Sequence, residues 1–223
     1  MKQTVFEGDD DMRLDSEQLK MLDNPRRMLG SSNVKIDDID FPHTDLTMLA
    51  GKRWPNGEVF YEISSNNFRT QTQAQIKKYV STLHDNLSPC IKFIERNHGD
   101  RIVVDFSQTQ SNSKVGYHGG KQYIYLTMDG VNQGTVHHEF LHSLGMIHEH
   151  QRNDRDKYVK NKSSMLKSNP INYQKFNRKI SFNYGQEYDF NSVMHYGKTG
   201  RLADGTKTTV IKTIDPKMLL DSE

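Results

Sequence analysis

Half of the chain's histidines lie in one short stretch, and this cluster constrains the fold more than any other feature. Five of the ten histidines fall between residues 137 and 150. A helix followed by a sharp turn would bring several of these imidazoles to one place. The stretch contains the pattern H-E-x-x-H-x-x-G-x-x-H, formed by His138, Glu139, His142, Gly145 and His148.

Helical periodicity separates an apolar face from an imidazole pair in this segment. At about 100° per residue from Val136, Phe140 falls near ~40°, whereas His138 and His142 fall near ~200° and ~240°. The pair is one helical turn apart and faces away from the core, as two ligands of one metal ion require. His137 falls near ~100°, inside the apolar arc. We therefore expect His137 to be a packed core residue with a hydrogen-bond partner rather than a ligand.

Glu139 and Gly145 complete a pattern that suits a catalytic metal. Glu139 falls near ~300°, beside the imidazole pair, which favours action on a water molecule over binding of the metal itself. Zinc lowers the pKa of its bound water to about 7, and a carboxylate can take the proton. Gly145 tolerates φ > 0 at a helix end, so the chain can turn and bring His148 back as a third ligand. Three histidines leave one position open, as in catalytic zinc sites.

A second signature follows later in the chain, at Ser192-Val193-Met194-His195-Tyr196-Gly197. Together the two signatures are the pattern of metzincin metalloproteases. Within that clan the chain resembles the astacin family over about residues 53–215. The other matching segments are Arg53-Trp54-Pro55-Asn56-Gly57, Cys90-Ile91-Lys92-Phe93, Val115-Gly116 with Gly119-Gly120 and Gln122, and Glu149 with Arg152, Asp154, Arg155, Asp156, Tyr158 and Val159.

The resemblance implies a fold and a set of site residues. The implied fold is α/β, of the α+β kind: a zincin-like domain of two subdomains, with a twisted, mostly parallel sheet, two main helices above the cleft and an irregular lower subdomain. The implied activity is that of a zinc endopeptidase with one zinc ion per chain. The resemblance also implies that the strand Tyr123–Met128 is the edge to which an extended substrate adds. The implied roles are zinc ligation by His138, His142 and His148, general base and acid catalysis by Glu139, oxyanion stabilisation by Tyr196, and a floor beneath the site from Met194.

The first 50 residues carry a charge opposite to the rest of the chain. They hold 6 Lys+Arg against 11 Asp+Glu, a balance of −5, and the remaining residues hold 24 against 17, a balance of +7. Phe6-Glu7-Gly8-Asp9 resembles the family's propeptide switch, in which the Asp carboxylate occupies the zinc, with Asp10 and Asp11 as alternatives. We therefore expect an inhibitory arm over residues 1–44 and a catalytic domain over residues 45–223. An activating protease would remove the arm, and Glu149 would receive the freed ammonium.

Composition argues against several other classes of protein. Mean hydropathy is −0.82, and no window offers the ~18 consecutive apolar residues of a membrane span. The sequence has no stripe of Lys and Arg with interleaved aromatic residues, so it does not suggest a nucleic-acid partner. We expect protein or peptide substrates and, by family analogy, secretion. The N-terminus lacks the apolar stretch of a secretory signal, which leaves open an intracellular protein or a signal outside this chain.

The chain departs from the family in its cysteines and its C-terminus. Most members carry four cysteines in two bridges, whereas Cys90 is alone here and the positions of two others hold Ser111 and Gly130. We expect Cys90, set between apolar residues, to be a buried and inert thiol. The chain ends at Glu223 without the final helix of the family, which indicates truncation or divergence.

Three residues are candidates for substrate binding. Tyr117 stands where the family usually has an Arg beside the cleft, and Lys198 and Arg201 follow the Met-containing signature. The two cations would favour an acidic residue on the leaving side of the scissile bond. A competing hypothesis is a binding module that keeps zinc for stability and whose cleft is blocked. The missing cysteines and the short C-terminus support this hypothesis, because they are compatible with a protein that has lost catalytic activity.

Overall fold

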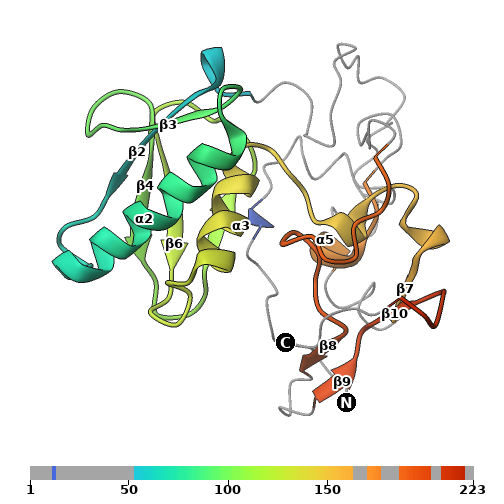
Figure 1. Cartoon of the computed structure of the whole chain (residues 1–223). Coiled ribbons are helices and arrows are strands. Elements are labelled where there is room, and N and C mark those ends of the chain that lie inside the picture. The colour runs from blue at the N-terminus through green and yellow to red at the C-terminus, as the bar shows by residue number, and fades with distance from the viewer. Residues whose placement is uncertain (1–11, 14–52, 163–169, 177–185, 202–206, 219–223) are drawn as a thin grey trace, which may run out of the picture. The chain divides into compact units, whose positions relative to one another are not determined.

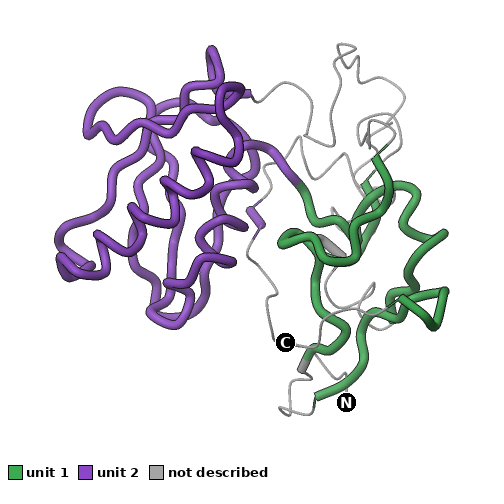
Figure 2. The backbone as a smooth tube through the Cα atoms, viewed as in Figure 1, with its two compact units in different colours: residues 1–9, 14–50, 147–223 green, residues 10–13, 51–146 purple. Residues whose placement is uncertain are grey.

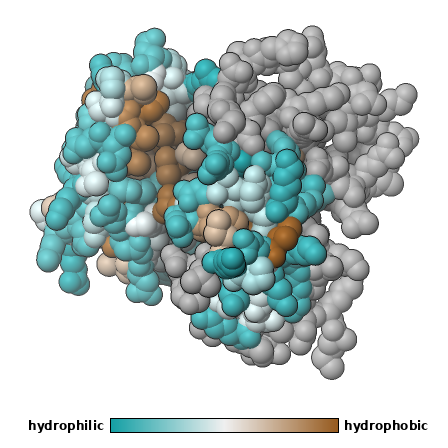
Figure 3. All heavy atoms as spheres, turned by 45° about the vertical axis from the view of Figure 1, so that its right-hand side comes forward, coloured by the Kyte–Doolittle hydropathy of each residue, from teal (hydrophilic) through white to brown (hydrophobic). Residues whose placement is uncertain are grey.

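The computed structural model describes residues 12–13, 53–162, 170–176, 186–201 and 207–218. This part of the chain forms two compact units, which Figure 2 colours separately. One unit contains residues 12–13 and 53–146, and the other contains the described residues from 147 onward. Within the described ranges, no helix combines the length and the apolar character needed to cross a membrane. Hydrophilic residues cover most of the described part of the face seen in Figure 3.

The first unit is built on a six-stranded sheet with the order β1-β5-β6-β4-β2-β3. All of its strand pairs are parallel except β5 with β6, which confirms the mostly parallel sheet predicted from the sequence. The strands are β1 (Met12–Arg13), β2 (Glu58–Ile63), β3 (Lys92–Glu95), β4 (Arg101–Phe106), β5 (Asn112–Lys114) and β6 (Lys121–Leu126).

Two helices, α2 (Thr70–Leu87) and α3 (Gln133–Ser143), cover one face of this sheet (Figure 1). Helix α2 buries Ile76, Val80 and Leu83, whose spacing in the sequence is that of an amphipathic helix. Phe140 of α3 makes edge-to-face contacts with Tyr61 of β2 and Phe93 of β3, with ring centroids 5.9 and 5.4 Å apart. These aromatic contacts join α3 to the sheet and fix its position in the unit.

The prediction that the strand around residues 123–128 forms the sheet edge is wrong. The structure places β6 between β4 and β5, so both of its edges are already paired. Strand β5 lies beside β6, and the N-terminal strand β1 pairs in parallel with the far side of β5, so β1 is the outermost strand. The short polar sequence of β5 carries no β-branched or aromatic residue, which is why its pairing could not be read from the sequence.

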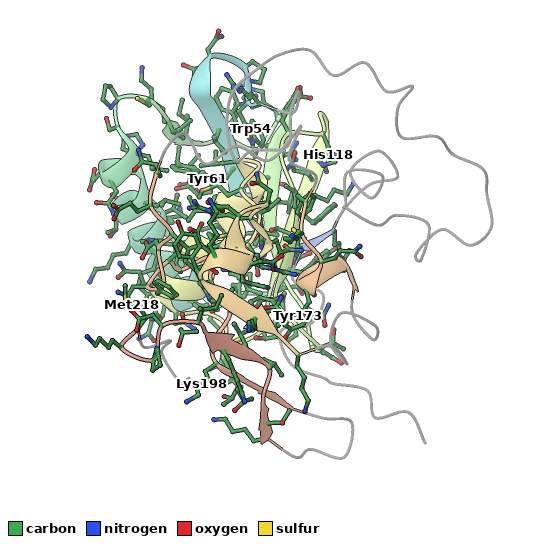
Figure 4. All side chains as sticks on the ribbon, turned by 90° about the vertical axis from the view of Figure 1, so that its right-hand side faces the viewer. Trp54, Tyr61, His118, Tyr173, Lys198 and Met218 are labelled. Atoms are coloured by element: carbon green, nitrogen blue, oxygen red, sulfur yellow. The ribbon has the colours of Figure 1, made fainter. Side chains whose placement is uncertain are left out.

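The entry to the first unit is tied to the end of α3 by Trp54, which is labelled in Figure 4. The Trp54 indole Nε1 donates to the Ser143 carbonyl at 2.9 Å, and its ring contacts Tyr117 edge-on, with centroids 5.0 Å apart. A 3-10 turn, η3 (Pro55–Gly57), then leads into β2. Cys90, predicted to be buried, is exposed instead, because it lies in the turn between α2 and β3 rather than in either element.

The second unit has only short elements, in agreement with the irregular lower part that the sequence predicts. A small core of Val159, Tyr173, Tyr188, Val210 and Ile211 holds it together. Strands β7 and β10 pair antiparallel, as do β8 and β9. The elements are η4 (Glu149–Gln151), η5 (Arg155–Lys157), β7 (Val159–Asn161), α5 (Pro170–Tyr173), β8 (Thr199–Arg201), β9 (Lys207–Thr209) and β10 (Ile211–Thr213).

Two buried arginines stabilise the irregular backbone of this unit. Arg155 donates from Nη1 to the His150 carbonyl at 2.8 Å, and Arg152 donates to the carbonyls of Gln186 and Glu187, each at 3.1 Å. A guanidinium carries five N–H donors, so it can satisfy loop carbonyls that no helix or sheet pairs. These arginines replace regular hydrogen bonding where the sequence offers little periodicity.

Candidate metal centre

Helix α3 is built to present two histidines. Its N-cap is Asn132, whose side-chain oxygen accepts a hydrogen bond from the Thr135 amide at 2.9 Å and so satisfies one free donor of the first turn. Val136 and Phe140 are fully buried, as the apolar arc predicts. The rings of His138 and His142 are neighbours on this helix, with centroids 4.5 Å apart.

Gly145 ends the helix as the sequence predicts, with φ of 106°. The Gly145 amide donates to the His142 carbonyl at 2.7 Å, and the Met146 amide donates to the Leu141 carbonyl at 3.0 Å. This pair of bonds is a Schellman motif, which needs a residue at positive φ just past the helix. The motif reverses the chain direction within three residues of His148.

The three predicted ligands come together. One ring nitrogen from each of His138, His142 and His148 can be chosen so that all three atoms lie within 4.8 Å of one another. Nδ1 of His142 donates to the Met146 carbonyl at 2.7 Å, and Nδ1 of His148 contacts Oε1 of Gln151 at 3.0 Å. A proton held on Nδ1 leaves the lone pair of Nε2 for a metal. This donor set fits zinc, so the three histidines could hold a zinc ion.

Glu139 and His137 take different positions on α3. Glu139 is buried, with 1% of its surface exposed, although carboxylates are rarely buried without a specific role. His137 is only half-buried, and its Nε2 contacts the Tyr79 carbonyl at 2.9 Å, which joins α3 to α2. The predicted hydrogen-bond partner is therefore confirmed, whereas the predicted core position is wrong, because the ring lies between α2 and α3 and stays partly exposed.

The Met-containing signature forms a tight turn in the second unit. The His195 amide donates to the Ser192 carbonyl at 2.9 Å, and Met194 is buried, with 1% of its surface exposed. The Met194 carbonyl accepts from the Glu149 amide at 2.9 Å, which fixes the turn against the segment that follows His148. The Tyr196 ring lies against the His148 ring, with centroids 4.4 Å apart.

Glu149 is a largely buried carboxylate with two partners. Its Oε1 accepts from Arg152 Nη1 at 2.7 Å and from the Asp189 amide at 3.0 Å. Burial raises the pKa of Glu149 above its ordinary value, and the two donors oppose part of that rise. The carboxylate is therefore held by its own neighbours within the unit.

His150 is a site-adjacent residue whose role sequence reasoning did not find. It is fully buried, and its ring stacks on that of His148, with centroids 5.2 Å apart and an interplanar angle of 18°. Burial lowers the pKa of His150 well below its ordinary value. Its only signal in the sequence is its place in the histidine cluster, two residues after the third ligand.

The remaining predicted residues differ in how far the structure describes them. The Tyr117 hydroxyl donates to the Asp100 carboxylate, and this bond raises the pKa of Tyr117. Lys198 is exposed at the residue before β8 (Figure 4). Arg201 is the last residue of β8, and its side chain lies outside the described structure. Asp9, the predicted latency ligand, also lies outside the described residues.

Comparisons with known proteins agree with this geometry. Residues 47–220 match the model of the family Astacin (Peptidase family M12A). Zinc metalloproteinase nas-4 of Caenorhabditis elegans is 31% identical, over 72% of this chain and 51% of that protein. The low choriolytic enzyme of Oryzias latipes is 33% identical, over 74% of this chain and 61% of that protein. The chain thus spans about half the length of nas-4.

A solved structure shows the same fold. High choriolytic enzyme 1, a hatching enzyme zinc-protease from Oryzias latipes, superposes with a TM-score of 0.60 at 30% identity. The match covers 76% of this chain and 84% of that one. The mostly parallel sheet with two helices on one face is therefore the arrangement of a metzincin catalytic domain.

Proposed function

Because the chain belongs to the astacin family, we propose that it is a zinc-dependent endopeptidase whose N-terminal arm holds it latent. The observation that carries the proposal is the convergence of His138, His142 and His148, whose ligand atoms lie within 4.8 Å of one another. The hydrogen bonds from Nδ1 of His142 and His148 support it, because they leave both Nε2 atoms as ligands.

Glu139 is the general base and acid of this proposal. Bound zinc would polarise the scissile carbonyl and lower the pKa of the attacking water. The Glu139 carboxylate takes a proton from that water as the water oxygen bonds to the carbonyl carbon. As the C–N bond breaks, Glu139 passes this proton to the leaving nitrogen. Its burial supports the role, because a carboxylate in a site of low polarity is a stronger base than one in water.

Tyr196 and Met194 complete the catalytic set. The Tyr196 phenol donates a hydrogen bond to the oxyanion that develops on the substrate carbonyl, a contribution worth about 3 kcal/mol in comparable sites. The position of its ring against His148 supports this assignment. Met194, a buried residue of the turn that leads to Tyr196, forms the floor of the site.

Substitution of Glu139 tests the catalytic assignment. The full chain carrying Glu139→Gln, loaded with zinc and cleaved in the arm, should bind one zinc ion and lose at least about a thousandfold in kcat on a peptide substrate. Glu95→Gln is the control, since Glu95 forms an ion pair on the surface and should leave kcat unchanged. Parent-like turnover by Glu139→Gln would contradict the assigned base. A parent chain that binds zinc but never cleaves peptides would favour the binding module.

Latency rests on the arm of residues 1–44 and its aspartate. Met12 and Arg13 form strand β1 along the edge of β5 that faces away from β6, and the Val115 amide donates to the Arg13 carbonyl at 3.3 Å. Met12 is 3% exposed, and the Arg13 guanidinium lies 5.3 Å from the centre of the Tyr125 ring. An arm docked on β5 would exclude an extended peptide from the same backbone groups. This docking supports an inhibitory arm, with Asp9 three residues before the strand as the proposed zinc ligand.

An uncleaved variant tests the latency. Asp9→Ala should hydrolyse peptides before any protease is added, whereas the parent should require cleavage between the arm and the domain that starts near Asp45. Asp15→Ala is the control and should stay silent until cleavage. If Asp9→Ala is as silent as the parent, the switch residue is another, and Asp10→Ala and Asp11→Ala identify it by the same assay.

Four further assignments belong to the proposal. Tyr117, Lys198 and Arg201 contact the substrate, and Glu149 receives the ammonium that activation frees. An activating protease is the second partner, and the protein acts outside the cell, as family analogy indicates.

Lys198→Ala should lower kcat/KM for peptides with an acidic residue after the scissile bond more than for neutral ones, and an equal loss for both would reject the preference.

A further inference from the structure

The backbone of Tyr196 is hydrogen bonded to two imidazoles, those of buried His150 and half-buried His195. On one side, the Tyr196 carbonyl lies 2.6 Å from Nδ1 of His195. On the other, the Tyr196 amide donates to Nδ1 of His150 at 3.4 Å. Neither imidazole belongs to the proposed ligand set, so the catalytic proposal gives them no role.

The outer nitrogens of both rings are also bonded. Nε2 of His195 lies 2.6 Å from the Tyr188 hydroxyl, and Nε2 of His150 lies 2.7 Å from the Asn172 carbonyl. A carbonyl only accepts and an amide only donates, so each ring has one nitrogen whose role is set by its partner. His195 must carry its proton on Nδ1, and His150 must carry its proton on Nε2.

These assignments make one consistent chain of donors. With the His195 proton on Nδ1 alone, the Tyr188 hydroxyl donates to Nε2 of His195, and His195 donates to the Tyr196 carbonyl. The Tyr196 amide donates to His150, and His150 donates to the Asn172 carbonyl. In this arrangement each imidazole carries one proton, on the nitrogen that faces a backbone carbonyl. Its central member is the peptide backbone of the residue that carries the proposed oxyanion donor.

Ring contacts continue the same arrangement at the side chain. The Tyr196 ring lies 4.5 Å from the His150 ring and 5.7 Å from the Tyr173 ring, measured between centroids. A tyrosine side chain reaches its hydroxyl position through two torsions that start at Cα. Fixing the amide and the carbonyl therefore fixes the direction of the Cα–Cβ bond, and the neighbouring rings limit the remaining torsions.

We propose that His150 and His195 are positioning residues that hold Tyr196 from both sides of its backbone, so that the phenol meets the developing oxyanion. The inference rests on the proposed function, since it takes Tyr196 as the oxyanion donor. It assigns no contact with substrate to either imidazole. It predicts a loss in kcat rather than in KM when the hydrogen bonds to Tyr196 are removed.

A pair of conservative variants separates the two bonds of His195. In His195→Asn the amide occupies the position of Nδ1 and can still donate to the Tyr196 carbonyl. In His195→Gln the amide occupies the position of Nε2 and retains only the Tyr188 partner. Positioning predicts that the Asn variant keeps most of the parent kcat, whereas the Gln variant loses about tenfold or more at unchanged KM. Equal kcat values for the two variants would overturn the proposal.

A double-mutant cycle distinguishes this proposal from the one on which it rests. The variants are Tyr196→Phe, His195→Gln and their combination, each in zinc-loaded full chain after cleavage of the arm, with exposed His98→Gln as the control. Positioning through the phenol predicts that His195→Gln costs little further kcat once the hydroxyl is gone. Additive losses would overturn the positioning role and leave the catalytic role of Tyr196 intact. An unchanged kcat for Tyr196→Phe would overturn that catalytic role and this proposal with it.

Imidazole nitrogen spectra give a readout that does not depend on turnover. In the zinc-loaded full chain at pH 7, long-range proton–nitrogen correlations should show His195 protonated at Nδ1 alone and His150 protonated at Nε2 alone. The His150→Asn and His150→Gln variants repeat the kinetic test on the other side of Tyr196, with Asn keeping the acceptor for its amide. Reversed tautomers in either ring would contradict the donor chain.

Discussion

Burial keeps the imidazole of His195 neutral at the pH of ordinary assays. Its pKa is lowered to about 4, chiefly because burial disfavours the charged ring. The hydrogen bond to the Tyr196 carbonyl works in the opposite direction, and nearby His148 adds to the lowering. In the unfolded chain the same ring would have the ordinary pKa of about 6.5. The difference links protonation of this residue to the stability of the fold.

Stability should therefore fall with pH through a defined window. Between about pH 6.5 and pH 4 the unfolded chain binds a proton at His195 that the folded chain excludes, so the free energy of unfolding decreases as pH falls. From pH 7 to pH 5 this residue should account for about 2 kcal/mol of the loss. Urea unfolding of the parent and of His195→Asn at both pH values measures it, because the other titrating groups are common to both. A parent and variant with equal losses would contradict the depressed pKa.

Cys90 shows how a single residue is misjudged from its neighbours in sequence. Apolar residues on both sides predict burial, yet the thiol is exposed in the turn after α2. The backbone of Cys90, and not its thiol, is closely packed. It lies against Gly57 of η3, where an added Cβ would be 2.3 Å from the Cys90 carbonyl oxygen. Burial of a turn residue depends on where the chain reverses, and periodicity within the flanking elements carries no information on that.

The end of α3 is the element on which the metal centre depends. A helix supplies His138 and His142, and the Schellman motif at Gly145 supplies the reversal before His148. Both parts are visible in the sequence, because a helical stripe and a following glycine are local signals. The sheet edge is not local, since β5 lies between β6 and β1 only when strands distant in sequence pair.

Substitution of the glycine at the end of α3 should weaken zinc binding. Gly145→Ala places a side chain at φ of 106°, a region that costs a non-glycine residue about 1–2 kcal/mol. The strain either lowers the free energy of unfolding by that amount or reopens the turn before His148. Chelator competition should show a lower zinc affinity than in the parent, and thermal unfolding should show a lower Tm.

Gly134→Ala provides the matched control in the same helix. An added Cβ at Gly134 meets only Asn132 Oδ1 at 3.4 Å, an ordinary contact, and the position has no positive φ. Alanine stabilises a helix relative to glycine by about 0.5–1 kcal/mol. Zinc affinity should stay at the parent value in this variant. If both glycine variants bind zinc equally well, the turn at Gly145 does not set the position of the third ligand.

At the scale of the whole molecule, hydrogen bonds stand where the family has a disulfide. Ser111 Oγ accepts from the Thr127 amide at 3.1 Å, and Thr127 Oγ1 accepts from the Gly130 amide at 3.0 Å. An added Cβ at Gly130 would lie 2.3 Å from Ser111 Oγ. The two chain segments thus remain in contact without a covalent bridge.

The thermal stability of the parent should consequently not change when a reductant is added. A variant with an engineered disulfide between positions 111 and 130 should lose stability on reduction. Tm of the parent should be the same with and without a phosphine reductant. In the double variant Ser111→Cys with Gly130→Cys, oxidation should close a loop and raise stability by about 3 kcal/mol, and reduction should remove the gain. A parent that loses stability on reduction, or a double variant that does not oxidise, would contradict this close approach.

The sequence alone determined the parts of this protein that depend on neighbours along the chain. The spacing of His138, Glu139, His142, Gly145 and His148 specifies a helix, its end and three imidazoles, because each interval is set by helical geometry. Periodicity likewise located α2 and β2, and the second signature pointed to the family. These features are encoded within windows of a few turns.

Only the tertiary structure decided what distant segments do to one another. It put β6 inside the sheet, paired Met12 and Arg13 with β5, and placed His150 and His195 on either side of the Tyr196 backbone. Except for the contact between the adjacent residues His195 and Tyr196, these results are pairings between segments far apart in the chain. Such pairings depend on the packing of side chains and on which buried polar groups find partners, and no period in the sequence records them.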